Sequence, residues 1–146
     1  MMDNTISEAY CGLFEKDYQD AQGYHRRAEK FLQLGRPSSL VFNVASMALE
    51  RYLVALCDLY GISPENHNYT CLMEAAETIL EFPLALNRAI RSLDEIFGIC
   101  SLETYHHGTP EASDASRVLS LCNEVQAMFD QTRIAAVLAE CHREAV

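Results

Sequence analysis

The sequence predicts an all-α protein, a single compact bundle of about five helices with a long central second helix. Apolar residues recur at intervals of three and four along most of the chain, which is the spacing of one helix face. No stretch alternates apolar and polar residues as a half-buried strand does. The four prolines, Pro37, Pro64, Pro83 and Pro110, each stand where the helical pattern breaks. These four joints separate five helical segments.

The first helix is expected to begin near Thr5 and to end at Gly35. The stretch "TISE" is a capping box, in which Thr5 and Glu8 each satisfy a free backbone N–H of the first turn. Glycine commonly follows a helix because it adopts left-handed backbone angles without strain. The predicted apolar face of this helix comprises Tyr10, Leu13, Phe14, Ala21, Tyr24, Ala28, Phe31 and Leu32.

The second helix is expected to run from about Ser39 to Tyr60 and to be apolar on most sides. Its main apolar face comprises Val41, Val44, Ala45, Ala48, Tyr52, Ala55, Leu56 and Leu59. A second apolar face comprises Phe42, Leu49 and Leu53. A helix of this kind is packed by several neighbours, so it is predicted to lie at the centre of the bundle.

Turn and cap residues place the remaining helices. The third is expected over residues 69–80 with Asn68 as its N-cap, and the fourth begins at Pro83. The fifth begins with Thr109 as N-cap and Pro110 at its first position. All are expected to belong to one domain, residues 1–146. The tail, residues 131–146, is expected to extend the last helix or to form a short sixth segment.

Composition and charge narrow the class of protein. The chain has 146 residues and a net charge of −10, with 21 acidic and 11 basic side chains. This balance disfavours nucleic acid as a non-specific ligand, because such binding rests on neutralising phosphates. No apolar run approaches the roughly 18 residues that span a bilayer, and the N-terminus does not resemble a signal peptide. The six cysteines are widely spaced without a C-x-x-C pair, so they are interpreted as reduced thiols. A cytoplasmic protein with no membrane contact is expected.

Residues 45–76, "ASMALERYLVALCDLYGISPENHNYTCLMEAA", resemble the signature segment of the HEPN domains (higher eukaryotes and prokaryotes nucleotide-binding). That family shows a helix of the form A-x-E-K-x-L-x-A-L, a Gly-Pro turn and a "T/N-H-D/N-L" element. The matching positions are Ala48, Glu50, Arg51, Leu53, Ala55, Leu56, Gly61, Pro64, His67 and Asn68. The stretch "YHHGTPEASDASRVL" is similar to the family's C-terminal element. The resemblance covers roughly residues 5–130.

The resemblance implies a homodimer that acts with a nucleotidyltransferase-type protein partner, as in toxin–antitoxin pairs, or by nucleotide binding. Many members resemble ribonucleases whose arginine is followed four to six residues later by a histidine. His67, His106 and His107 have no arginine at that distance before them. We therefore expect no catalytic residues and a protein that works by association.

An enzyme is the alternative interpretation. A ribonuclease site could be assembled across a dimer from His106 or His107 and a non-adjacent arginine, Arg91 or Arg117. A histidine would transfer the proton and an arginine would hold the scissile phosphate.

Glu50, Arg51 and His67 are candidate groove or ligand-binding residues. Glu50 and Arg51 point about 100° apart as helix neighbours, so they are not expected to pair with each other. One is expected to reach solvent while the other meets a first-helix residue such as Arg27 or Glu29, unless both line a polar groove at a subunit interface. His67 is expected either to orient the turn before the third helix or to line that groove.

Tyr105, His106 and His107 form the other candidate group, in the loop "ETYHHGTP". Adjacent histidines on a loop point in different directions, and a structural zinc site needs about four ligands. The loop is therefore interpreted as a joint between helices, and no metal and no cofactor are expected.

Overall fold

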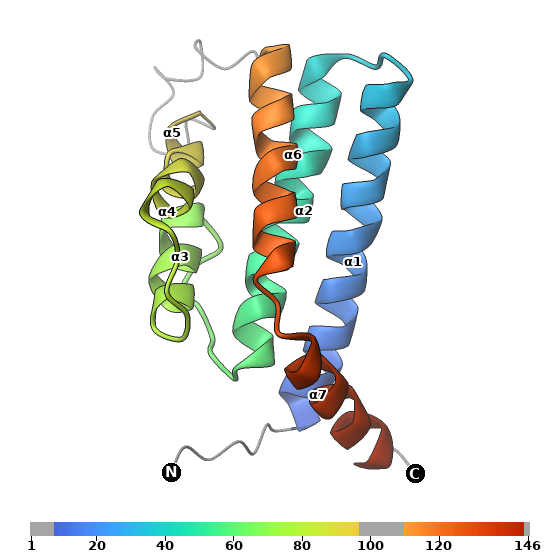
Figure 1. Ribbon diagram of the computed structural model, residues 1–146, viewed down its shortest axis with the longest axis vertical. Coiled ribbons are helices and arrows are strands. Elements are labelled where there is room, and N and C mark those ends of the chain that lie inside the picture. The colour runs from blue at the N-terminus through green and yellow to red at the C-terminus, as the bar shows by residue number, and fades with distance from the viewer. Residues whose placement is uncertain (1–7, 97–109, 145–146) are drawn as a thin grey trace.

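The computed structural model describes residues 8–96 and 110–144, and every regular element in these two ranges is a helix (Figure 1). The helices are α1 (Glu8–Gln33), α2 (Ser38–Leu59), α3 (Tyr69–Glu77), α4 (Leu84–Arg91), α5 (Leu93–Ile96), α6 (Ala112–Ala127) and α7 (Gln131–Glu144). The predicted all-α fold class is confirmed. Helix α2 packs along α1 and α6, while α3, α4 and α5 form a shorter group beside them (Figure 1).

Helix α2 is the central element, as predicted. All eleven residues of its two predicted apolar faces are buried. By length and composition α2 could also cross a membrane, which differs from the expectation that no apolar stretch approaches that length. However, 72% of that stretch is buried inside the fold, as in the core helix of a bundle.

Four aromatic rings join the N-terminal half of α1 and the C-terminal half of α2 to the turn between α6 and α7. The centroids of Phe14 and Tyr18 lie 5.3 Å apart, and those of Tyr18 and Phe129 lie 4.9 Å apart. Tyr52 of α2 meets Phe129 at 6.1 Å. Pairs at these distances add to the stabilisation that burial of the rings already provides.

The buried face of α1 differs from the prediction at several positions. Leu13 and Leu32 are 50% and 45% exposed. The buried face instead comprises Cys11, Phe14, Asp17, Ala21, His25 and Ala28, at intervals of three and four residues. The prediction failed at these positions because it admitted only apolar residues, whereas the face includes a carboxylate and an imidazole.

Three helix ends also differ from the prediction. Helix α3 ends at Glu77 rather than near Leu80. The fourth predicted helix is divided into α4 and α5. Helix α6 begins after Glu111, where the Asp114 carboxylate accepts a hydrogen bond from the Glu111 N–H at 2.9 Å. The predicted cap Thr109 lies outside the described residues. This bond is one half of a capping box, in which the Glu111 side chain also accepts from the Asp114 N–H. Capping boxes commonly start helices, so Asp114 helps to set the start of α6.

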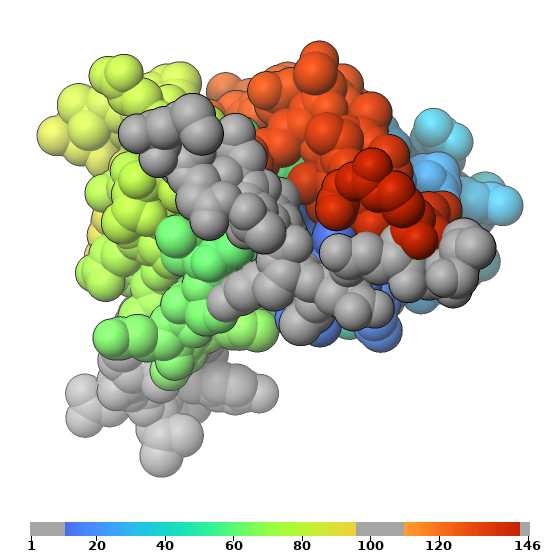
Figure 2. Space-filling view, turned by 90° about the horizontal axis from the view of Figure 1, so that it is seen from below, coloured from blue at the N-terminus to red at the C-terminus, as the bar shows by residue number. Residues whose placement is uncertain are grey.

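The tail forms a separate helix, α7, the second of the two outcomes expected from the sequence. Asp130 starts it by accepting hydrogen bonds from the N–H groups of Thr132 and Arg133 at 2.9 and 3.1 Å. Arg133 Nε donates to the carbonyl of Leu59 at 2.9 Å, and its guanidinium stacks 4.3 Å from the Tyr60 ring centroid. These contacts hold α7 across the end of the bundle, where it lies against α1 (Figure 2).

Candidate functional site

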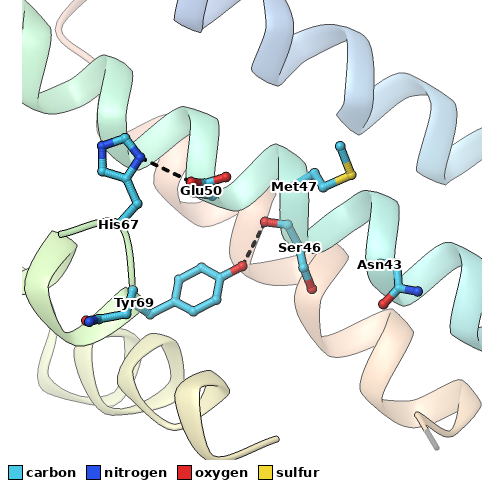
Figure 3. Close-up of a pocket in the computed structure, with 7 residues that line it drawn as sticks. Asn43, Ser46, Met47, Glu50, His67 and Tyr69 are labelled. Atoms are coloured by element: carbon cyan, nitrogen blue, oxygen red, sulfur yellow. Dashed lines mark hydrogen bonds and ion pairs between the residues drawn. The ribbon is translucent and has the colours of Figure 1, made fainter. Parts of the chain in front are cut away.

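A surface groove lies between α2 and the start of α3 (Figure 3). Its volume is about 320 Å³. The residues that line it are Asn43, Ser46, Met47 and Glu50 from α2, and His67, Asn68 and Tyr69 from the following turn. Two residues selected from the sequence, Glu50 and His67, thus meet at one site.

The first turn of α3 forms one wall of the groove. Hydrogen bonds to its backbone hold this wall in place. Asn68 is the N-cap, as predicted, and its side chain accepts a hydrogen bond from the Cys71 N–H at 2.8 Å. Asp94, from α5, accepts from the N–H groups of Tyr69 and Thr70, both at 2.9 Å. A carboxylate at this position satisfies free N–H groups and interacts favourably with the helix dipole.

Tyr69 joins this turn to α2. Its ring is buried, and its hydroxyl donates to the carbonyl of Ser46 at 2.8 Å (Figure 3). Burial, with a further contribution from the Glu50 charge, raises the pKa of Tyr69 well above its ordinary value. The tyrosine therefore remains a neutral hydrogen-bond donor in the groove wall.

A chain of charged groups runs from the interior of the bundle to the groove. Arg51 donates from Nη1 to Asp17 Oδ1 and from Nη2 to Glu50 Oε2, each at 3.1 Å. Glu50 Oε2 also lies 3.3 Å from His67 Nδ1 (Figure 3). One arginine therefore connects the buried carboxylate of α1 with the carboxylate at the groove.

This geometry corrects two expectations about Glu50 and Arg51. They do pair, because the long arginine side chain reaches around the helix although the two Cα–Cβ bonds diverge. The partner of Arg51 on α1 is Asp17, not Arg27 or Glu29. His67 precedes the N-cap of α3 and lines the groove beside Glu50. Its expected role in orienting the turn stays a prediction.

Asp58 extends the charged chain into the core. It is buried near Asp17, and its Oδ2 has no hydrogen-bond partner among the described residues. Burial, followed by the hydrogen bond to Asp17 and the charge of Asp17, raises the pKa of Asp58 to about 8. The Asp58 carboxyl therefore holds its proton to a higher pH than an exposed aspartate does.

The remaining candidate residues cannot be joined to the groove. Tyr105, His106 and His107 lie outside the described residues. Arg91 donates to Asn87 at 2.7 Å and pairs with Glu77, and Arg117 is exposed on α6. Within residues 8–96 and 110–144, no three His, Cys, Asp or Glu side chains gather as metal ligands would.

Four buried polar residues escaped the sequence interpretation: Asp17, His25, Ser46 and Asp58. His25 Nδ1 lies 2.8 Å from the Tyr52 hydroxyl, which joins α1 to α2. A signal for Asp17 and His25 was present, because both fall in register with Phe14, Ala21 and Ala28 on the buried face.

No protein-family model, curated protein or solved structure matches this chain. The HEPN resemblance of residues 45–76 therefore stays a prediction.

Proposed function

We propose that this chain is a non-catalytic, HEPN-like helical bundle that acts in the cytoplasm by protein association. The observation that carries the proposal is an exposed stripe on the central helix. Between Leu40 and Glu50, the residues of α2 that are not buried are Leu40, Asn43, Met47 and Glu50, spaced as one helix face. We call these four residues the α2 stripe.

The α2 stripe has the chemistry of a protein-binding surface. Leu40 is 38% exposed and Met47 is 43% exposed, so two large apolar side chains face solvent on an otherwise buried helix. Methionine adapts its shape to a bound surface because its side chain is unbranched and flexible. The groove overlaps the stripe, because Asn43, Met47 and Glu50 belong to both.

Charge indicates the kind of partner. The chain carries a net charge of −10, and Glu50 places a carboxylate at the end of the stripe. Electrostatic complementarity favours a partner with a basic face. A nucleotidyltransferase-type protein is the partner that the family resemblance suggests.

Self-association would use a different surface. Leu32 and Leu34 are 45% and 58% exposed at the turn where α1 meets α2. Apolar side chains gathered at one end of a bundle favour an isologous contact in a homodimer.

Site-specific photocrosslinking tests the partner surface. A photoreactive amino acid replaces Asn43 on the α2 stripe in one variant and Glu124, exposed on α6, in a control. We expect an adduct with a basic protein from position 43 and none from position 124, identified by mass spectrometry. Equal adducts from both positions, or none from position 43, would contradict the proposal.

Two further assays separate the alternatives. Labelled nucleotides that bound saturably, with no protein adduct at position 43, would favour nucleotide binding over protein association. Incubation with unstructured RNA tests the enzyme. Cleavage by the wild-type protein that is lost in His106→Ala and His107→Ala would overturn the non-catalytic proposal.

A further inference from the structure

We infer that the groove beside α2 binds an alkylammonium group, the terminus of a lysine side chain of the partner. This inference rests on the proposed function insofar as the groove belongs to the partner-binding surface. It adds the chemical class of the group that enters the groove.

The polar groups of the groove suit a cation with several donors. Glu50 supplies a carboxylate, and Ser46, one turn before it on α2, supplies a hydroxyl. The Ser46 hydroxyl is buried and has no hydrogen-bond partner among the described residues, although most buried polar groups are paired. An ammonium group has three donors and no acceptor, so it can donate to both of these oxygen-bearing groups.

The local charge also favours a cation. Arg51 is shared between Asp17 and Glu50, so one guanidinium faces two carboxylates. The groove end of the chain thus retains negative charge, which would repel the phosphates of a nucleotide.

The apolar walls suit the stem of a lysine. The flexible Met47 side chain and the Tyr69 ring come from opposite sides of the groove (Figure 3). Lysine buries its four methylene groups along apolar surface while its ammonium keeps polar partners. The volume of about 320 Å³ is at the small end of ligand sites, as expected for a single side chain.

Methyl NMR of the full chain, titrated with n-butylammonium, tests this site. The methionine methyl groups are ¹³C-labelled, so Met47 reports on the groove while the buried Met73 reports on the fold. We expect n-butylammonium to shift the Met47 signal saturably and to leave Met73 unchanged. n-Butanol and butyrate, which match the stem but lack the cation, should produce no saturable shift.

Variants identify the acceptors. Glu50→Gln should weaken n-butylammonium binding about tenfold and Ser46→Ala about threefold, as expected for charged and neutral hydrogen bonds. Glu124→Gln, the same charge change on α6, should leave binding unchanged. An unshifted Met73 signal confirms that each variant is folded.

Three outcomes would overturn the inference: no saturable shift, equal shifts with n-butanol, or undiminished binding by Glu50→Gln. Tighter binding of n-butylguanidinium would overturn the assignment to lysine. Since the titration needs no partner, its failure alongside a position-43 adduct would reject the ammonium site and retain the association function. Saturable n-butylammonium binding without an adduct at position 43 would reject the proposed association function and retain the ammonium site.

Discussion

Asp17, Arg51 and Asp58 show how charged residues are accommodated at the largely apolar contact between α1 and α2. An isolated buried carboxylate is costly, and the cost falls when it is paired or protonated. Asp17 is paired with Arg51 at 3.1 Å, whereas burial raises the pKa of Asp58 and so favours its protonated form. Both solutions occur within one contact between α1 and α2.

The protonated Asp58 makes stability depend on pH. Its pKa is about 8 in the folded protein and near the ordinary 3.8 in the unfolded chain. The folded state therefore holds the proton over a wider pH range, and linkage makes this contribution fully present below about pH 4. This stabilising contribution decreases as the pH rises and does not change further above about pH 8.

Asp58→Asn should remove this dependence, because the amide stays neutral and can still donate to Asp17. Relative to wild type, the free energy of unfolding of the variant should increase steadily from pH 5 to pH 8. Urea denaturation at several pH values measures the difference. Parallel pH profiles for the two proteins would show that Asp58 does not hold a proton in the folded state.

At the scale of elements, short helices depend on contacts from distant segments. Helix α3 has nine residues, too few for stability on its own. Asp94 of α5 stabilises it by accepting from Tyr69 N–H, Thr70 N–H and the Thr70 hydroxyl, the last at 2.7 Å. The wall of the groove therefore depends on a residue 25 positions away in sequence.

Asp94→Ala tests this dependence. Loss of a capping carboxylate should lower the free energy of unfolding by about 1–2 kcal/mol. It should also increase the hydrogen-exchange rates of the Tyr69 and Thr70 amides. Glu95→Ala, which removes the adjacent exposed carboxylate, serves as the control and should change neither quantity. Equal effects of the two variants would indicate a general charge effect rather than a cap.

At the scale of the whole molecule, the bundle leaves apolar side chains exposed in particular places. Leu34 lies at the end of the α1–α2 hairpin, and Leu84 lies at the start of α4. Their exposed fractions, 58% and 63%, are similar, so exposure alone does not distinguish an interface. Among the residues that the structure describes, a second exposed leucine close in sequence, Leu32 in the last turn of α1, is found at the hairpin end and not beside Leu84.

Sedimentation equilibrium tests self-association at this end. Wild type should run at twice the 16.4 kDa mass of one chain, and Leu34→Glu should run as a monomer because the charge would be buried in the contact. Leu84→Glu is the matched control and should remain dimeric. A monomeric wild type, or dissociation by both variants, would contradict a dimer formed through the hairpin end.

The sequence by itself determined the all-α class, the central position of α2 and the cap of α3 by Asn68. These follow from local rules, since apolar periodicity and cap residues act within a few positions along the chain. It also selected Glu50 and His67. Only the tertiary structure showed that Arg51 joins Asp17 to Glu50, that Asp58 is buried near Asp17 with a raised pKa, and that Asp94 caps α3. Such contacts depend on how helices pack side by side, and residues distant in sequence carry no local pattern that reveals their pairing.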